Sequence, residues 1–164
     1  MTCPTALKYQ LAMFPRLLLS ILIAVGAVSA QKYDGPKPPK PDLPYIKHAT
    51  TLLPTEAVEA KPQKKKDSAT YVIEGANSPA RTPLAAPIFL FDRGKIDPAS
   101  LQLFQLESKN GHRESGEKKA EPFRIEVTPL DGTLYRIEPY DGLEPGEYAL
   151  SVSGSNQVFC FAVF

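Results

Sequence analysis

Residues 123–164 read FRIEVTPLDGTLYRIEPYDGLEPGEYALSVSGSNQVFCFAVF, and the fold class can be inferred from them. Short runs in which apolar and polar residues alternate are separated by turn-forming pairs, Asp131-Gly132 and Asp141-Gly142. Alternation with a period of two is typical of strands with one buried face, and Asp-Gly suits the positive φ of a tight hairpin. We therefore expect a hairpin about Asp131-Gly132. The side chains on its buried face should be Phe123, Ile125, Val127, Tyr135 and Ile137.

The same pattern extends back to Thr70. The expected strands are 70–74, 88–91, 101–107, 123–128, 134–138, 148–152 and 158–164. About seven short strands without a long helical period predict an all-β antiparallel β-sandwich, which we place at residues 68–164. Its last strand, VFCFAVF, is apolar on both faces. It is therefore expected to be a central strand, or an edge strand that pairs with a partner or with the N-terminal segment of the same chain.

One segment within this region has the pattern L-x-P-G-x-Y-x-L, over the eight residues Leu143-Glu144-Pro145-Gly146-Glu147-Tyr148-Ala149-Leu150. It resembles a strand-initiating motif of the immunoglobulin-like and prealbumin-like domains of exported bacterial proteins. The resemblance implies an immunoglobulin-like sandwich in which the tyrosine packs at a corner, with its hydroxyl on nearby backbone. It implies no ligand, because such folds carry adhesion, accessory and structural roles alike. The chain has no Trp, and Cys160 is its only Cys after residue 30, so an antibody-type domain with its disulfide is excluded.

Residues 1–30 have the features of a secretory signal peptide. Lys8 and Arg16 precede an apolar run at 17–25, small residues follow up to Ala30, and no acidic residue occurs. We expect cleavage after Ala30, with Met1 or Met13 as the start. The apolar run is shorter than the roughly 20 residues that span a bilayer, so no transmembrane segment is expected after cleavage. The mature chain is thus expected in the periplasm or outside the cell.

Residues 31–67 differ from the rest in composition. Prolines occur there at positions 36, 38, 39, 41, 44, 54 and 62, and the segment ends in a run of lysines. Proline fixes φ and has no amide hydrogen to donate, so we predict an extended arm or linker that precedes the sandwich. Two apolar islands, Tyr45-Ile46 and Leu52-Leu53, could instead dock on the sandwich as a short edge strand. Both alternatives remain open.

The charge balance argues against a nucleic-acid partner. The chain has 19 Lys and Arg against 18 Asp and Glu, and its formal charge of +1 becomes −1 when Lys8 and Arg16 leave with the signal peptide. Proteins that bind nucleic acid carry a marked basic excess. The sequence also lacks metal-ligand spacings such as His-x-x-x-His or CxxC, and it lacks a glycine-rich phosphate loop. No cofactor or metal is expected.

Catalysis by a nucleophile is not expected either. Cys160 lies between Phe159 and Phe161, where a thiol usually is a small buried apolar group with a raised pKa. His48 falls in the arm and His112 beside an expected hairpin tip, so neither is placed to activate that thiol. We expect a non-catalytic protein with a structural or accessory role, which acts through contacts with a protein or another component of the cell envelope. The sequence leaves the oligomeric state open.

Two other functions remain as alternatives. One is a module that binds a polyanion or a glycan, since lysines are attracted to anionic surfaces and tyrosines stack on sugars. Its candidate residues are Lys61, Lys64, Lys65 and Lys66 at the end of the arm, together with surface tyrosines. His112 and Arg113, in a polar loop expected at 109–121, are further candidates for binding because loops often carry specificity. The other is a hydrolase whose site is assembled by the fold and cannot be seen in the sequence.

Overall fold

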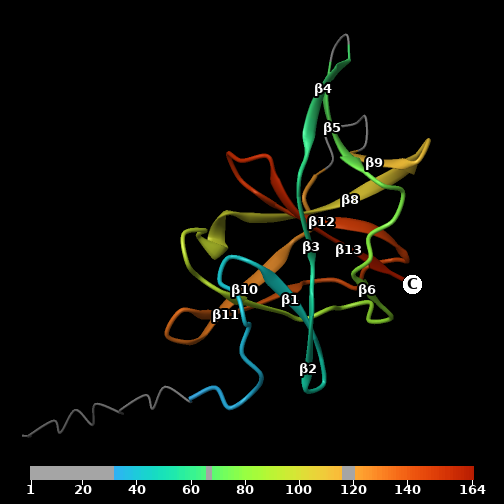
Figure 1. Ribbon diagram of the computed structural model, residues 1–164. Coiled ribbons are helices and arrows are strands. Elements are labelled where there is room, and N and C mark those ends of the chain that lie inside the picture. The colour runs from blue at the N-terminus through green and yellow to red at the C-terminus, as the bar shows by residue number, and fades with distance from the viewer. Residues whose placement is uncertain (1–31, 66–67, 116–120) are drawn as a thin grey trace, which may run out of the picture.

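The computed structural model describes residues 32–65, 68–115 and 121–164. The expected signal peptide, Lys66 and part of the expected polar loop lie outside the described residues. The described chain forms two antiparallel sheets that pack face to face (Figure 1). This confirms the all-β sandwich, although its described part has thirteen strands where about seven were expected. No helix in these three ranges has the length and apolarity that a membrane span requires.

The first sheet, sheet A, has the strand order β10-β11-β7-β1-β2. Its strands are β1 (Pro44–His48), β2 (Thr51–Pro54), β7 (Phe89–Asp92), β10 (Ile125–Asp131) and β11 (Leu134–Pro139). The predicted hairpin is confirmed, because β10 pairs with β11 and Gly132 between them has φ +58°. Ile137 is fully buried and Ile125 packs against the same core, whereas Phe123 keeps 36% of its surface exposed.

The second sheet, sheet B, has the order β3-β13-β12-β8-β9-β5-β4, with β6 paired to β13 in parallel. Its strands are β3 (Glu56–Glu59), β4 (Lys61–Lys65), β5 (Ser68–Glu74), β6 (Arg81–Thr82), β8 (Leu101–Lys109), β9 (His112–Ser115), β12 (Gly146–Val152) and β13 (Gln157–Val163). Only Ala60 separates β3 from β4, yet the two strands stand at opposite ends of this order. Sheet B therefore curls until it nearly closes into a barrel.

The last strand explains why its sequence is apolar on both faces. Phe159 and Phe161 of β13 lie in the core between the two sheets, where Phe161 is 5.0 Å from Phe89 between ring centroids. Val158 and Cys160 face a second, smaller interior inside the curl of sheet B. Strand β13 is paired with β12 on one side and with β3 on the other. The expectation of a central strand is confirmed, and the strand that covers it comes from the N-terminal segment of the same chain.

The extended arm predicted over residues 31–67 is wrong for residues 44–65, which form β1, β2, β3 and β4. The docking alternative holds, since Tyr45 and Ile46 pair with both β7 and β2. Proline did not prevent strand formation because Pro44 begins β1 and Pro54 ends β2, where a missing amide hydrogen costs little. Upstream, Lys37 reaches Asp131 at 3.7 Å. The boundary expected after residue 67 falls between the paired strands β4 and β5 and separates no domains.

The L-x-P-G-x-Y segment starts β12 as a turn followed by a buried tyrosine. Tyr148 is 1% exposed, and its hydroxyl donates a hydrogen bond of 2.8 Å to the backbone oxygen of Glu144. This is the corner contact that the resemblance implied. The ring of Tyr148 stacks on Phe161 at 5.6 Å between centroids, so the motif anchors β12 to the core between the sheets.

Candidate functional site

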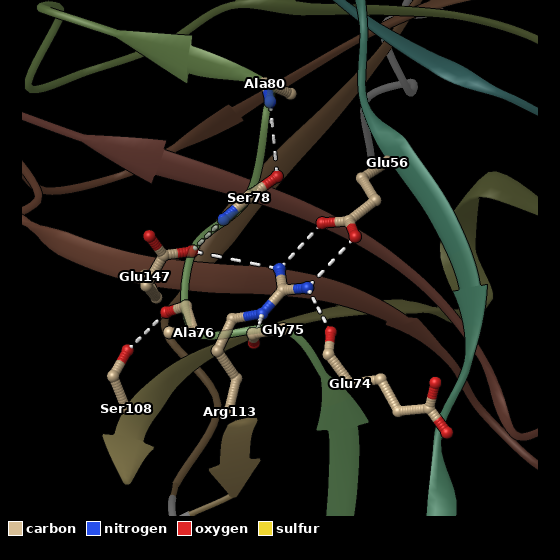
Figure 2. Close-up of polar contacts among 9 residues, drawn as sticks. All are labelled: Glu56, Glu74, Gly75, Ala76, Ser78, Ala80, Ser108, Arg113 and Glu147. Atoms are coloured by element: carbon tan, nitrogen blue, oxygen red, sulfur yellow. Dashed lines mark hydrogen bonds and ion pairs between the residues drawn. The ribbon is translucent and has the colours of Figure 1, made fainter. Parts of the chain in front are cut away.

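A charged side chain lies in the second interior. Arg113 stands on β9 opposite Ile73 of β5, and its side chain is 0% exposed. The sequence suggested a polar loop at this position, but residues 109 and 112 are paired across a tight turn at Asn110-Gly111. Because Ile73 belongs to the apolar cluster of the curl, Arg113 points into the same interior. Figure 2 shows the polar groups gathered about it.

The guanidinium of Arg113 is held on both of its edges (Figure 2). Its Nη1 and Nη2 donate to the two carboxylate oxygens of Glu56 at 2.7 and 3.0 Å, which is a bidentate pair. Nε donates to the backbone oxygen of Gly75 at 2.9 Å, and Nη2 also donates to that of Glu74 at 3.0 Å. Glu147 adds an ion pair at 3.8 Å and accepts a hydrogen bond of 2.9 Å from the backbone N–H of Ser78. Together these groups form what we call the arginine clasp.

Opposite charges in the clasp compensate the burial of the Arg113 cation. Burial disfavours the cation of Arg113, yet the hydrogen bonds that Arg113 donates to Glu56 and the charges of the nearby carboxylates outweigh it and raise the pKa of the guanidinium. For Glu147, burial dominates and raises the pKa, although the Ser78 N–H and Arg113 oppose that rise. The clasp joins β3, β5, β9 and β12, so its evident effect is to hold the curled sheet closed.

The thiol beside the clasp is not a nucleophile at neutral pH. Cys160 is 0% exposed, and its burial raises the pKa of the thiol to about 12, with Arg113 opposing the rise. The thiolate is the reactive form, so a thiol with this pKa stays inert near pH 7. The expectation that Cys160 is a buried apolar group is confirmed.

Arg113 does not lie on the surface with the other residues that the sequence suggested for binding. Arg113 is buried in the clasp, so the suggestion that it binds a ligand from a polar loop is wrong. His112 is half-buried, with Nε2 at 3.8 Å from a carboxylate oxygen of Glu114. Lys61 is exposed but forms an ion pair with Glu74. The backbone of Lys64 and Lys65 lies in β4, and Lys66 is outside the described residues.

Metal ligands are not gathered in the described part of the chain. There, no group of three or more His, Cys, Asp or Glu side chains is placed to hold a metal ion. His48 instead lies with its Nε2 at 2.9 Å from the Oγ1 of Thr82, a hydrogen bond that links β1 to β6.

A surface that the sequence had not singled out lies at one end of the sandwich. The exposed large hydrophobic side chains of the described residues are Tyr71, Leu84, Phe123, Tyr140 and Phe164. Of these, Leu84 follows β6, Phe123 precedes β10, Tyr140 follows β11 and Phe164 follows β13, and we call these four residues the apolar end. The C-terminus lies beside β6 in Figure 1.

Backbone hydrogen bonds connect the parts of the apolar end. The N–H of Phe164 donates to Thr82 at 3.2 Å, next to the loop that exposes Leu84. Leu143 donates to Ala85 in that loop at 2.7 Å, which brings the segment after Tyr140 to the same place. The N–H of Tyr140 donates to Arg124, the neighbour of Phe123, at 2.9 Å.

Two arginines stack on the exposed rings of the apolar end. The guanidinium of Arg124 lies 4.2 Å from the ring centroid of Tyr140, and that of Arg81 lies 4.8 Å from that of Phe164. Tyr140 and Phe164 are 61% and 60% exposed, so these contacts leave most of each ring open to water. A signal was present in the sequence, since Pro83, Leu84, Ala85 and Ala86 form an apolar run without the alternation of a strand.

Comparison of the chain with protein-family models, with curated proteins and with solved structures gave no match.

Proposed function

We propose that this is an exported, non-catalytic protein with a structural or accessory role, which acts by binding another protein through its apolar end. The carrying observation is that exposed Tyr, Phe and Leu side chains gather at one end, with two arginines stacked on the rings. Exposed large apolar side chains that gather in one region of a protein surface mark contact sites. Tyr, Phe and Arg are the residue types that protein interfaces favour at their centres.

Pairing of strand edges is not the contact that we propose. Of the four strands at the ends of the two sheet orders, β2, β4 and β10 each contain a proline, at positions 54, 62 and 129, and β3 contains none. Proline on an edge strand removes a donor and hinders the addition of another strand. The suggestion that the C-terminal strand pairs with a partner is wrong, because β12 and β3 occupy both of its edges. Side chains at the end of the sandwich are therefore the better contact surface.

Binding of a polyanion or a glycan remains a second candidate, supported by one feature. Tyr71 is 43% exposed on β5 and pairs with Pro62 of β4, next to Lys61 and the strand that carries Lys64 and Lys65. The ion pair with Glu74 already compensates Lys61, which weakens this candidate. Retention on an anionic matrix that is lost when Lys61, Lys64 and Lys65 become Gln would favour it over the apolar end. No observation supports the hydrolase alternative.

The proposed function is tested by crosslinking in the source cells. A photoreactive amino acid replaces Tyr140 in one variant and Tyr71 in the control, since both side chains are exposed tyrosines. On irradiation, we expect the variant at position 140 to form a discrete protein adduct. We expect the variant at position 71 not to form that adduct. The proposal is overturned if position 140 gives no protein adduct, or if both positions give the same adducts.

A further inference from the structure

We infer that the occupant of the apolar end is a second copy of this chain, in a two-fold symmetric dimer. This inference rests on the proposed function, because it names the partner of the same surface. In a two-fold dimer the same patch meets itself, so the patch must complement its own charges as well as its shape. The apolar end meets that condition.

The charges around the apolar end are of both signs. Arg81 and Arg124 are exposed, and so are Asp141 and Glu144 in the loop after Tyr140. None of the four takes part in an ion pair within the described ranges. An acidic partner would leave the two carboxylates facing like charge, and a basic partner would do the same to the arginines. A second copy supplies both signs at once.

The order of these charges along the chain suits a two-fold axis. Arg124 lies over the ring of Tyr140, and Asp141 is the next residue after that tyrosine. An axis that passes beside Tyr140 would bring the two exposed rings together and place Arg124 of each copy against Asp141 of the other. Aromatic rings at the centre with charged pairs at the rim are the usual anatomy of a protein interface.

The composition of the neighbouring loop also favours a homodimer. Pro83, Leu84, Ala85 and Ala86 are all exposed between β6 and β7. Homodimer interfaces are more apolar than the contacts of transient partners, because the two chains remain associated. The prolines on β2, β4 and β10 disfavour a dimer formed through a continuous sheet at these three strands.

The first test is sedimentation equilibrium of the mature chain, residues 31–164, over a range of concentrations. We expect a reversible dimer, and we expect Tyr140→Ser to raise its dissociation constant by roughly tenfold or more, since an aromatic side chain at an interface centre contributes strongly. Tyr71→Ser is the matched control and should leave the constant unchanged. A chain that is monomeric at all concentrations overturns the inference, as does a Tyr140→Ser variant that dimerises as well as the original.

A charge exchange tests the two-fold arrangement itself. Arg124→Asp and Asp141→Arg should each weaken the dimer, and the double variant should restore it, because each copy then offers the same pair in reverse. Arg93→Asp is the control, since Arg93 is exposed in the loop after β7. All of these positions are on the surface, so near-ultraviolet circular dichroism should stay unchanged. A double variant that is no better than the single ones overturns the proposed pairing.

The crosslinking experiment separates this inference from the proposed function. An adduct at position 140 with twice the mass of the chain supports both. An adduct with a different protein, together with a monomeric chain, overturns the dimer and leaves the proposed function standing. A monomeric chain without any adduct at position 140 overturns both.

Discussion

The two interiors of this protein are filled in different ways. The core between the sheets contains large rings, with Phe89, Phe159 and Phe161 all at most 1% exposed. The interior of the curled sheet contains small side chains, such as Ala60 and Ala149, beside the buried charge of the arginine clasp. Strands β12 and β13 contribute one face to each interior.

The difference shows how one pair of strands can serve two cores. The free energy gained by apolar packing between the sheets is roughly proportional to the apolar area removed from water, and it does not depend on the direction of individual contacts. The second interior contains fewer buried apolar residues than the core between the sheets. It is stabilised in addition by the directional hydrogen bonds of the arginine clasp, which join strands that are far apart in the sequence. Such bonds depend on every partner, because a buried charge that loses its counter-charge is destabilising. The two interiors should therefore respond differently to substitution and to pH.

The largest effect is expected from Phe161→Ala. Phe161 is 0% exposed and contacts the rings of both Phe89 and Tyr148, so its truncation leaves a cavity between the sheets. We expect the free energy of unfolding to fall by about 3–5 kcal/mol, measured by urea denaturation. Tyr71→Ala, at an exposed position outside the apolar end, should change it by less than about 1 kcal/mol. A loss below about 1 kcal/mol for Phe161→Ala would contradict the role of the core.

The next effect is expected from Arg113→Met, which keeps most of the apolar length of the side chain and removes its charge. Glu56 and Glu147 then lose their cation, and the free energy of unfolding should fall by about 3 kcal/mol. Adding Glu56→Gln to the Arg113→Met variant should recover part of this loss, because it removes a carboxylate that has lost its counter-charge. If Arg113→Met is as stable as the original chain in urea, the clasp has no role in stability.

A smaller effect is expected from Tyr148→Phe. This change removes the hydrogen bond from the hydroxyl to the backbone oxygen of Glu144 and keeps the ring in the core. The free energy of unfolding should fall by about 1 kcal/mol, the usual contribution of one hydrogen bond. Tyr71→Phe serves as the control, since this tyrosine is exposed outside the apolar end and water can bind its hydroxyl. Equal stability of the two variants would show that the corner contact contributes nothing measurable.

The smallest effect at neutral pH is expected from Cys160→Ala, at about 1 kcal/mol for a group of this size. Its pH dependence is the sharper test. The pKa of the thiol is about 12 when folded, against 9.0 for an unperturbed thiol. The contribution of the protonated thiol to the free energy of unfolding is thus fully present below about pH 9, and it is lost as the pH rises from about 9 towards 12. Urea denaturation between about pH 7 and 11 should show the original chain losing stability relative to Cys160→Ala. A constant difference over that range would contradict a buried thiol.

Most strands after residue 68 could be predicted because their alternation records which face is buried, whereas β6 and β9 were not expected. Residues 101–107 and 134–138 were expected as strands from this pattern and lie within β8 and β11. The turn at Asp131-Gly132 was predictable for a local reason, since glycine accepts φ +58° without strain. Of the four strands between residues 44 and 65, β1 and β2 were expected only as one of two alternatives, and β3 and β4 were not predicted, because prolines and short apolar islands are also typical of an extended arm.

The arginine clasp could not be predicted from local pattern. The segment KNGHRESGE around Arg113 is polar throughout, which favours an exposed loop. Glu56 lies 57 residues away in the sequence and reaches Arg113 only because β3 pairs with β13. Burial of a charge depends on a counter-charge supplied by another strand, and no periodicity within the segment carries that information.

The sequence by itself determined that the chain forms short antiparallel strands, where the main turns lie, and that VFCFAVF must be covered on both faces. These are consequences of local periodicity and of turn chemistry, which act over a few residues. Only the tertiary structure decided that β3 covers β13, that Arg113 is buried, and that Leu84, Phe123, Tyr140 and Phe164 meet at one end. The physical reason is that sheet pairing and charge compensation join residues far apart in the chain, and their partners are chosen when the whole fold closes.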